Sequence, residues 1–326
     1  MTDFRNCGKF IISLDFELLW GTFDRVGGQV YPTYFSNTRK VIPQILRTFE
    51  SHKVAATWAT VGMLFAESEE EWRMYMPKSL PTYQNPNLSP YHWVDRFGLN
   101  PTWHFAPELI QMILKTPHQE VGSHTFGHYY VGEAGQHADQ WRSDLQAARG
   151  IAFDKFHLKL KSMVFPRNQI NLDYLKICQE EGFEQYRSNP IDWYWQETYR
   201  ETFAKKVFRT ADCFVQMGSR KTFEACNLAS SPSAVLQIPA SRLLRPYHDQ
   251  WKWLNKLKLN RIKNEMTYAA KHQEAYHLWW HPHNFGNDPL QSMKELEEIL
   301  DHFTMLKENF GMESFSMQSL ADIHRE

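Results

Sequence analysis

The stretch VGSHTFGH, residues 121–128, places two histidines four positions apart at the end of a short apolar run. Gly122 permits a tight turn there, and Ser123 belongs to the residue types that cap a helix. In a helical turn, residues i and i+4 lie on one face, so the rings of His124 and His128 can bind the same ion. The spacing therefore indicates a metal site at a strand-to-helix junction, with a chance pair among 15 histidines as the alternative.

Segments typical of strands and of helices alternate on both sides of this stretch. Such an alternation predicts an α/β fold with a parallel sheet. A chain of 326 residues is long enough for two domains, but it contains no repeat and no linker, so we expect one domain over residues 1–326. The predicted strands are 9–14, 54–59, 162–165, 183–188, 235–239, 275–280 and 314–316, and the predicted helices are 36–52, 62–72, 107–116, 137–154, 171–182, 248–272 and 289–308.

Two segments rich in aromatic residues, about 75–106 and 189–233, interrupt this alternation and are too long for ordinary connections. Each lies next to a strand that carries a candidate functional motif. We therefore expect both insertions to form walls over a functional site and to set its choice of substrate. Core packing is the alternative role for their tryptophans, because aromatic side chains bury large areas anywhere in a protein.

The composition points to no charged partner. The net charge is −1, the pI is about 7.0, and no block of like charge is present, so we expect neither nucleic-acid binding nor membrane insertion. The apolar run at residues 10–14 is interrupted by Asp15 and Glu17, which argues against a signal peptide or a spanning helix and predicts a cytoplasmic protein. The four cysteines lie far apart, as is typical of reduced thiols.

Polar side chains capable of chemistry follow four of the predicted strands. In an α/β barrel the carboxyl ends of the strands meet at one face, where active sites lie. Two histidines and one carboxylate form a common catalytic zinc site with a position open for water. A further carboxylate can accept a proton from that water, and another histidine can protonate a leaving group. The residues at these strand ends are Asp15 with Glu17, His124 with His128, Arg167, and His281 with His283.

In this order, the motifs resemble those of the NodB-homology polysaccharide deacetylases, carbohydrate esterase family four, over roughly residues 10–323. The sequence SLDFE, residues 13–17, looks like the first motif, and residues 123–128 are similar to the second. Phe165-Pro166-Arg167 resembles the third motif, Ile191-Asp192-Trp193 the fourth, and residues 278–281 match the Leu-x-x-His pattern of the fifth. The resemblance implies a distorted (β/α)7 barrel.

The resemblance also implies a role for each residue. Asp15 would be the catalytic base, His281 the catalytic acid, Arg167 the residue that steadies the base, and Asp192 a support of the site. Glu17, His124 and His128 would bind one divalent metal ion, with zinc expected first and cobalt, nickel or iron as alternatives. The expected substrate contacts are Trp193, Trp195, His283 and Asn284.

Two features depart from the family pattern. The usual adjacent Asp-Asp is replaced by Asp15-Phe16-Glu17, and strand alternation points both carboxylates to one side, which favours Glu17 as the ligand. Arg167 follows its proline instead of preceding it, so an ordinary surface position is its alternative. Asp192 also fits a turn, and His283 can replace His281 as the acid because both project in the same strand direction.

The predicted function is metal-dependent removal of an N-acetyl or other N-acyl group from an amino sugar of a polysaccharide, a lipopolysaccharide or a precursor. Two alternatives remain open. One is an amidohydrolase or deformylase that acts on a small, non-polymeric amide in the cytoplasm. The other is a non-catalytic carbohydrate-binding protein built on a decayed barrel, in which Asp15 and Glu17 merely form buried ion pairs.

Overall fold

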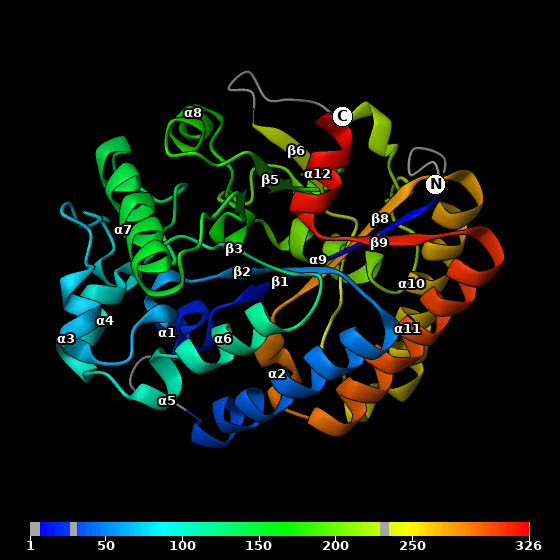
Figure 1. Ribbon diagram of the computed structural model, residues 1–326, viewed down its shortest axis with the longest axis horizontal. Helices are drawn as coiled ribbons and strands as arrows, with labels where there is room; N and C mark the ends of the chain where they lie inside the picture. Colours follow the sequence, from blue (N-terminus) through cyan, green and yellow to red (C-terminus); the bar gives the residue numbers. More distant parts are fainter. Residues whose placement is uncertain (1–6, 27–30, 229–234, 326) are drawn as a thin grey trace.

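A curled sheet of parallel strands forms the centre of the molecule (Figure 1). The computed structural model describes residues 7–26, 31–228 and 235–325. The strand order is β6-β5-β4-β3-β2-β1-β8-β7, and β9 pairs with β1. The strands are β1 (Lys9–Phe16), β2 (Ala56–Thr60), β3 (Gln119–Ser123), β4 (Ser162–Met163), β5 (Gln185–Ser188), β6 (Leu236–Pro239), β7 (Arg242–Leu243), β8 (Ala275–Trp280) and β9 (Glu313–Phe315).

The two end strands of this order are consecutive in the sequence. β6 pairs with β5, whereas β7, which begins three residues after β6 ends, pairs with β8. Between them, the Ala240 N–H donates to the Ser188 carbonyl at 2.9 Å and the Ser241 N–H donates to the His277 carbonyl at 2.8 Å. One extended segment therefore joins both ends of the sheet and curls it into a barrel, which confirms the predicted α/β barrel.

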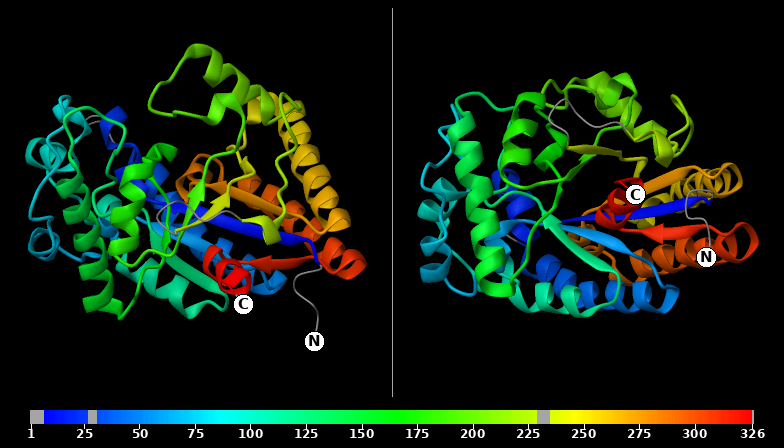
Figure 2. Two further views of the ribbon diagram at one scale, coloured as in Figure 1. Left: turned by 90° about the horizontal axis from the view of Figure 1, so that it is seen from above. Right: turned by 45° about the horizontal axis from the view of Figure 1, so that its top comes forward.

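Helices cover the outside of the curled sheet (Figure 2). Most follow the predicted alternation, and every residue of β1 is buried. No helix in the described part of the chain is long and apolar enough to span a bilayer. The helices are α1 (Phe23–Val26), α2 (Pro32–His52), α3 (Glu69–Met74), α4 (Pro90–Phe97), α5 (Pro101–His104), α6 (Pro107–Lys115), α7 (Ala138–Phe156), α8 (Leu172–Glu180), α9 (Phe203–Asp212), α10 (Lys252–His272), α11 (Pro289–Phe310) and α12 (Met317–Arg325).

The two insertions have different places in the fold. The insertion at 75–106 contains α4 and α5 and packs beside the 3-10 turn Leu18–Gly21, where the Trp20 indole N–H donates to the His104 carbonyl at 2.8 Å. None of its residues lines the cavity at the carboxyl end of β1, so its predicted role as a wall is wrong. The insertion at 189–233 does supply a wall, with α9 and the 3-10 turn Trp193–Trp195; its residues 229–233 lie outside the described chain.

Candidate metal centre and its cavity

Glu17, His124 and His128 meet at the carboxyl ends of β1 and β3. The Glu17 Oε2 atom lies 3.2 Å from His124 Nε2 and 3.1 Å from His128 Nε2. All three side chains are buried, and their candidate ligand atoms lie within 4.8 Å of one another. The structure therefore brings together the three predicted ligands, although they come from segments more than a hundred residues apart.

The histidines do not lie on a helical turn, as the spacing predicted. After β3 the chain continues as an irregular loop, in which Thr125 and His128 have φ angles of 66° and 53°. The Asp144 carboxylate of α7 accepts the backbone N–H groups of Phe126 at 2.6 Å and Gly127 at 3.0 Å. The buried Asp144 thus satisfies two backbone N–H groups of the loop and holds the segment from which both histidine rings project.

The hydrogen bond on the far side of the His124 ring identifies its free nitrogen. His124 Nδ1 lies 2.8 Å from the Val164 carbonyl, which can only accept, so Nδ1 carries the hydrogen and the Nε2 of the neutral ring presents a lone pair. His128 Nδ1 lies 3.1 Å from the Tyr130 hydroxyl, and burial lowers the pKa of His128, which favours its neutral form.

Glu17 Oε2 faces these two rings without a hydrogen bond of good geometry from any residue that the structure describes. Nitrogen lone pairs and a carboxylate oxygen that meet in a buried space repel one another unless a cation lies among them. Two imidazoles and a carboxylate with outer hydrogen bonds are a typical donor set for a zinc-class ion, so the residues present fit such a metal.

Gly21 makes room for the Glu17 carboxylate. A Cβ atom at position 21 would lie 1.7 Å from Glu17 Oε1. The atom that this Cβ would meet belongs to the Glu17 carboxylate, which faces both histidines. Any larger residue at Gly21 would therefore displace the candidate ligand, a requirement that the sequence did not reveal.

Asp15 is held by Arg187, a residue that the sequence analysis missed. The two carboxylate oxygens accept hydrogen bonds from Arg187 Nη1 at 2.6 Å and Nη2 at 2.8 Å, and the guanidinium lies 4.3 Å from the centre of the Trp279 ring. Burial raises the pKa of Asp15, but the Arg187 charge and the neighbouring imidazoles outweigh burial, so the pKa lies below its ordinary value. Asp15 is therefore ionised at neutral pH.

Arg167 does not reach Asp15, and the predicted contact between them is wrong. Arg167 pairs instead with Asp24 and, at 3.5 Å, with Glu133, and its guanidinium lies 4.0 Å from the centre of the Tyr130 ring. Its backbone has a φ of 55° in the turn after β4, which carries the side chain to the edge of the cavity. Arg187, by contrast, lies within β5 and points into the barrel. An arginine inside a predicted buried strand was the available signal.

A buried hydrogen-bond chain lies beneath Arg187. The Ser13 hydroxyl accepts from Arg187 Nη1 at 3.0 Å and lies 2.8 Å from His277 Nε2. His277 Nδ1 lies 3.0 Å from the Pro239 carbonyl, so Nδ1 carries the hydrogen and Nε2 accepts from Ser13. Burial lowers the pKa of His277 to about 3, which keeps this ring neutral. Ser13 and His277 in the barrel interior thus orient Arg187, which in turn orients Asp15.

His281 and His283 lie on the other side of the Glu17 carboxylate. His281 Nε2 is 3.7 Å from Asp15 Oδ2 and 3.6 Å from Glu17 Oε1, and 26% of its side chain is exposed. His283 Nδ1 is 3.7 Å from Glu17 Oε1, and only 5% of its side chain is exposed. Burial lowers the pKa of His283 to about 4. Both rings line the cavity, and His281 is the more exposed of the two.

The structure does not bring Asp192 or Trp193 to this site, since neither lines its cavity. Asp192 pairs with Lys221 and accepts the Ser219 backbone N–H at 3.1 Å. Trp193 is half exposed and packs against Phe208, with 5.1 Å between ring centres. The predicted support of the site by Asp192 and the predicted substrate contact of Trp193 are therefore corrected by the structure.

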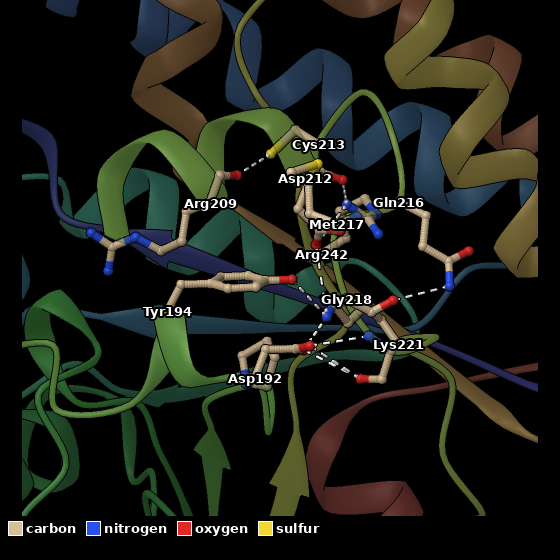
Figure 3. A network of polar contacts seen from close by, with 12 residues as sticks. Asp192, Tyr194, Arg209, Asp212, Cys213, Gln216, Met217, Gly218, Lys221 and Arg242 are labelled. Carbon is tan, nitrogen blue, oxygen red and sulfur yellow. Dashed lines mark hydrogen bonds and ion pairs between the residues drawn. The ribbon is translucent and has the colours of Figure 1, made fainter. Parts of the chain in front are cut away.

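The Asp192–Lys221 pair belongs to a buried ionic network that holds the insertion at 189–233 to the barrel (Figure 3). Asp212, at the end of α9, lies 3.8 Å from Lys221 Nζ and 3.5 Å from Arg242 Nη1. Arg242 of β7 in turn pairs with Glu265 of α10 at 2.9 Å. Four members of the network are more than nine-tenths buried, namely Asp212, Lys221, Arg242 and Glu265. The network therefore fixes α9 against β7 and α10.

A cavity of about 780 Å³ opens above the candidate metal centre. Its lower part is formed by Asp15, Glu17, His128 and His281. This volume lies within the range of ordinary small-molecule sites. Its sides include the predicted substrate contacts Trp195, His283 and Asn284, together with Tyr34, Asn168, Thr198, Tyr199 and Trp279.

Comparisons with known proteins agree with this architecture. No curated protein matches the chain. Among solved structures, a candidate polysaccharide deacetylase from Mycobacterium smegmatis is 14% identical, with a TM-score of 0.61 over 100% of this chain and 92% of that one. A second candidate polysaccharide deacetylase, from Pseudomonas aeruginosa PAO1, is 11% identical, with a TM-score of 0.52 over 98% and 90%. Puue allantoinase is 9% identical, with a TM-score of 0.54 over 99% and 91%.

At these identities the structural likeness shows the fold alone. The family is shown by the sequence, because the model of the polysaccharide deacetylase family matches residues 16–186, just over half of the chain. That segment runs from the end of β1 to β5 and includes both candidate metal histidines. The chain belongs to the polysaccharide deacetylase family.

Proposed function

We propose that this protein is a metal-dependent hydrolase that removes an N-acetyl or other N-acyl group from an amino sugar of a polysaccharide, a lipopolysaccharide or a precursor. The observation that carries the proposal is the buried set Glu17, His124 and His128 beside an ionised Asp15 at the base of an open cavity. Zinc as the ion and the cytoplasm as the location stay predictions.

The chain's own residues supply the proton transfers. A zinc-class ion, when bound, lowers the pKa of a water and polarises an acyl carbonyl. Asp15, kept ionised by Arg187, would accept a proton from the attacking water. His281, 3.7 Å from Asp15 and partly exposed in the cavity, would donate a proton to the leaving nitrogen. His283 is neutral and buried, which favours His281 as the acid.

The test of this function is a substrate panel with the zinc-loaded protein. N-acetylglucosamine, its oligomers, an N-formyl amino sugar and a small cyclic amide such as allantoin are incubated separately, and the released acid and amine are quantified. We expect acetate and free amine from the N-acetyl sugars. Turnover of the cyclic amide alone would replace the proposal with the small-amide alternative, and stoichiometric metal with no turnover of any probe would refute the assignment.

The role of His281 can be separated from mere positioning by changing the leaving group. An amine leaves poorly as an anion, so His281→Ala is expected to lower kcat on the sugar amide by about 10²-fold. An activated acetate ester needs little protonation of its leaving group, so its hydrolysis should change little. The measurement is kcat on both substrates for His281→Ala and His283→Ala. Equal losses on amide and ester, or a larger amide loss in His283→Ala, would contradict the role of His281.

Arg187 and Arg167 form a matched pair that tests the corrected assignment. In Arg187→Gln, burial is no longer opposed by the guanidinium, so the pKa of Asp15 rises. The base works only as the carboxylate, so activity is lost as the pH falls through this pKa. In the variant this loss should therefore begin at a higher pH than in the wild type, and kcat/KM at neutral pH should fall about tenfold or more. Arg167→Gln should leave the acidic limb of the pH profile in place.

The readout is the pH profile of kcat/KM together with the melting temperature of each variant. Arg187→Lys, which keeps a positive charge but loses the bidentate geometry, controls for the burial of an uncompensated Asp15. An unmoved acidic limb in folded Arg187→Gln would show that Arg187 does not set the ionisation of the base.

A further inference from the structure

The cavity above the candidate metal centre is lined by five cations and by four acids, which are Asp15, Glu17, Glu133 and Glu201. Two of its lining cations have close partners: Arg167 pairs with Asp24, and Arg209 pairs with Glu201. Three others line the same cavity without an ion pair to any residue that the structure describes. The five lining cations are Arg25, Arg167, Lys206, Arg209 and Arg245.

The three unpaired cations differ in their surroundings. Arg25 and Lys206 are exposed. Arg245 donates from Nε to the Cys213 sulfur at 3.2 Å and from Nη2 to the Thr210 hydroxyl at 3.1 Å, and both acceptors are uncharged. These two bonds orient the guanidinium without neutralising it, so a charge-assisted contact with a ligand remains available.

The three cations come from separate segments of the chain. Arg25 belongs to α1, shortly after β1; Lys206 belongs to α9; and Arg245 follows β7. The ionic network around Asp212 holds α9 and β7 in place, so two of the three positions are set by a rigid buried contact. Cations from three separate elements thus line one cavity.

The other large cavities carry different charges. The neighbouring cavity of about 830 Å³ has Glu197 as its single charged lining residue. A cavity of about 760 Å³ lined partly by α12 and β9 mixes lysines with acids, and Lys307 there pairs with Glu313 at 2.9 Å. The whole chain carries a net charge of −1. The 760 Å³ cavity also holds Lys53 and Lys159 without an ion pair in the described chain, but of these three cavities the metal-site cavity is the one that holds unpaired arginines.

Resting on the proposed function, we propose that the substrate is an amino-sugar derivative that carries a phosphate group, and that Arg25, Lys206 and Arg245 bind this group. A carboxylate brings one negative charge, whereas a phosphate monoester carries about −1.5 to −2 at pH 7 and offers three acceptor oxygens. Guanidinium groups match this geometry through paired N–H donors. Three unpaired cations are better matched by phosphate than by a single carboxylate.

The test compares kcat/KM of the zinc-loaded protein on N-acetylglucosamine 1-phosphate and on N-acetylglucosamine. We expect the wild type to prefer the phosphorylated sugar, and Arg25→Gln, Lys206→Gln and Arg245→Gln each to reduce this preference about tenfold, since a hydrogen bond to a charged group contributes roughly this factor. Arg47→Gln and Lys294→Gln remove exposed cations without ion pairs outside the cavity, and they should keep the wild-type preference.

Binding separates this inference from the proposed function. If neither sugar is hydrolysed, calorimetric titration of both sugars still decides whether the phosphate is recognised. Equal kcat/KM and equal affinity for the two sugars, or variants that retain the wild-type preference, would overturn the inference. Tighter binding of N-acetylmuramic acid, a carboxylate probe, than of the phosphorylated sugar would also overturn it. Arg25→Gln and Lys206→Gln change exposed residues, so a folding defect in Arg245→Gln does not remove the test.

Discussion

The double variant His124→Ala with His128→Ala is expected to lose bound metal and, with it, all measurable amide hydrolysis. The wild type should hold about one zinc-class ion per chain, because the two Nε2 atoms and the Glu17 carboxylate provide three protein ligands in a buried site. Removing two of the three ligands leaves too few donors. Metal content by mass spectrometry and acetate release from an N-acetyl sugar are the two measurements.

The control for this variant is His272→Ala with His324→Ala, two histidines of α10 and α12 that do not line the cavity. It should retain the metal and the activity of the wild type. Equal metal content in the two double variants would show that the ion, if any, binds elsewhere. Melting temperatures should be compared, because the loop that carries His124 and His128 is also held by Asp144 and does not depend on the histidines alone.

Asp15→Asn is expected to retain the metal and to lower kcat by about 10²–10⁴-fold, the usual contribution of a general base. Asn has nearly the same shape as Asp but accepts no proton at neutral pH. It also leaves the buried Arg187 without its counter-charge, so the melting temperature should fall while the fold persists. The measurements are kcat, metal content and circular dichroism of the same preparation.

Glu17→Gln is the matched comparison, since it changes the neighbouring carboxylate in the same way. It should lose most of the metal, because Glu17 Oε2 is the atom that faces both histidines. The opposite result, with metal lost in Asp15→Asn and retained in Glu17→Gln, would mean that the two carboxylates have exchanged roles.

The sequence predicted the parts of the site that depend on periodicity and on strand ends. β8 begins and ends where the prediction placed it, at 275–280, and His281 follows it directly. The convergence of Glu17 with His124 and His128 follows from the parallel pairing of β1 with β2 and of β2 with β3, which puts their carboxyl ends side by side. Each strand end is a local feature that alternation and spacing are sufficient to find, and the parallel pairing of the strands then brings these ends together.

The features that the sequence did not predict depend on contacts between distant segments. A spacing of four positions from one histidine to the next suggested a helical turn, but the Asp144 carboxylate binds the loop in another conformation. Which arginine reaches Asp15 is decided by the direction in which β5 and the turn after β4 carry their side chains. Asp192 pairs with Lys221 away from the site, and no local sequence pattern indicated that Lys221 is buried.

The ionic network around Lys221 and Arg242 has a consequence for how this enzyme family can diversify. It attaches the insertion at 189–233 through residues that do not touch the metal-binding set, so mutation of the outer face of α9 does not disturb the chemistry beneath it. Substrate preference can therefore drift, or be selected in a library randomised over 203–209, while Asp192, Asp212 and Lys221 are kept. Recognition and reaction would then evolve as separate modules of one chain.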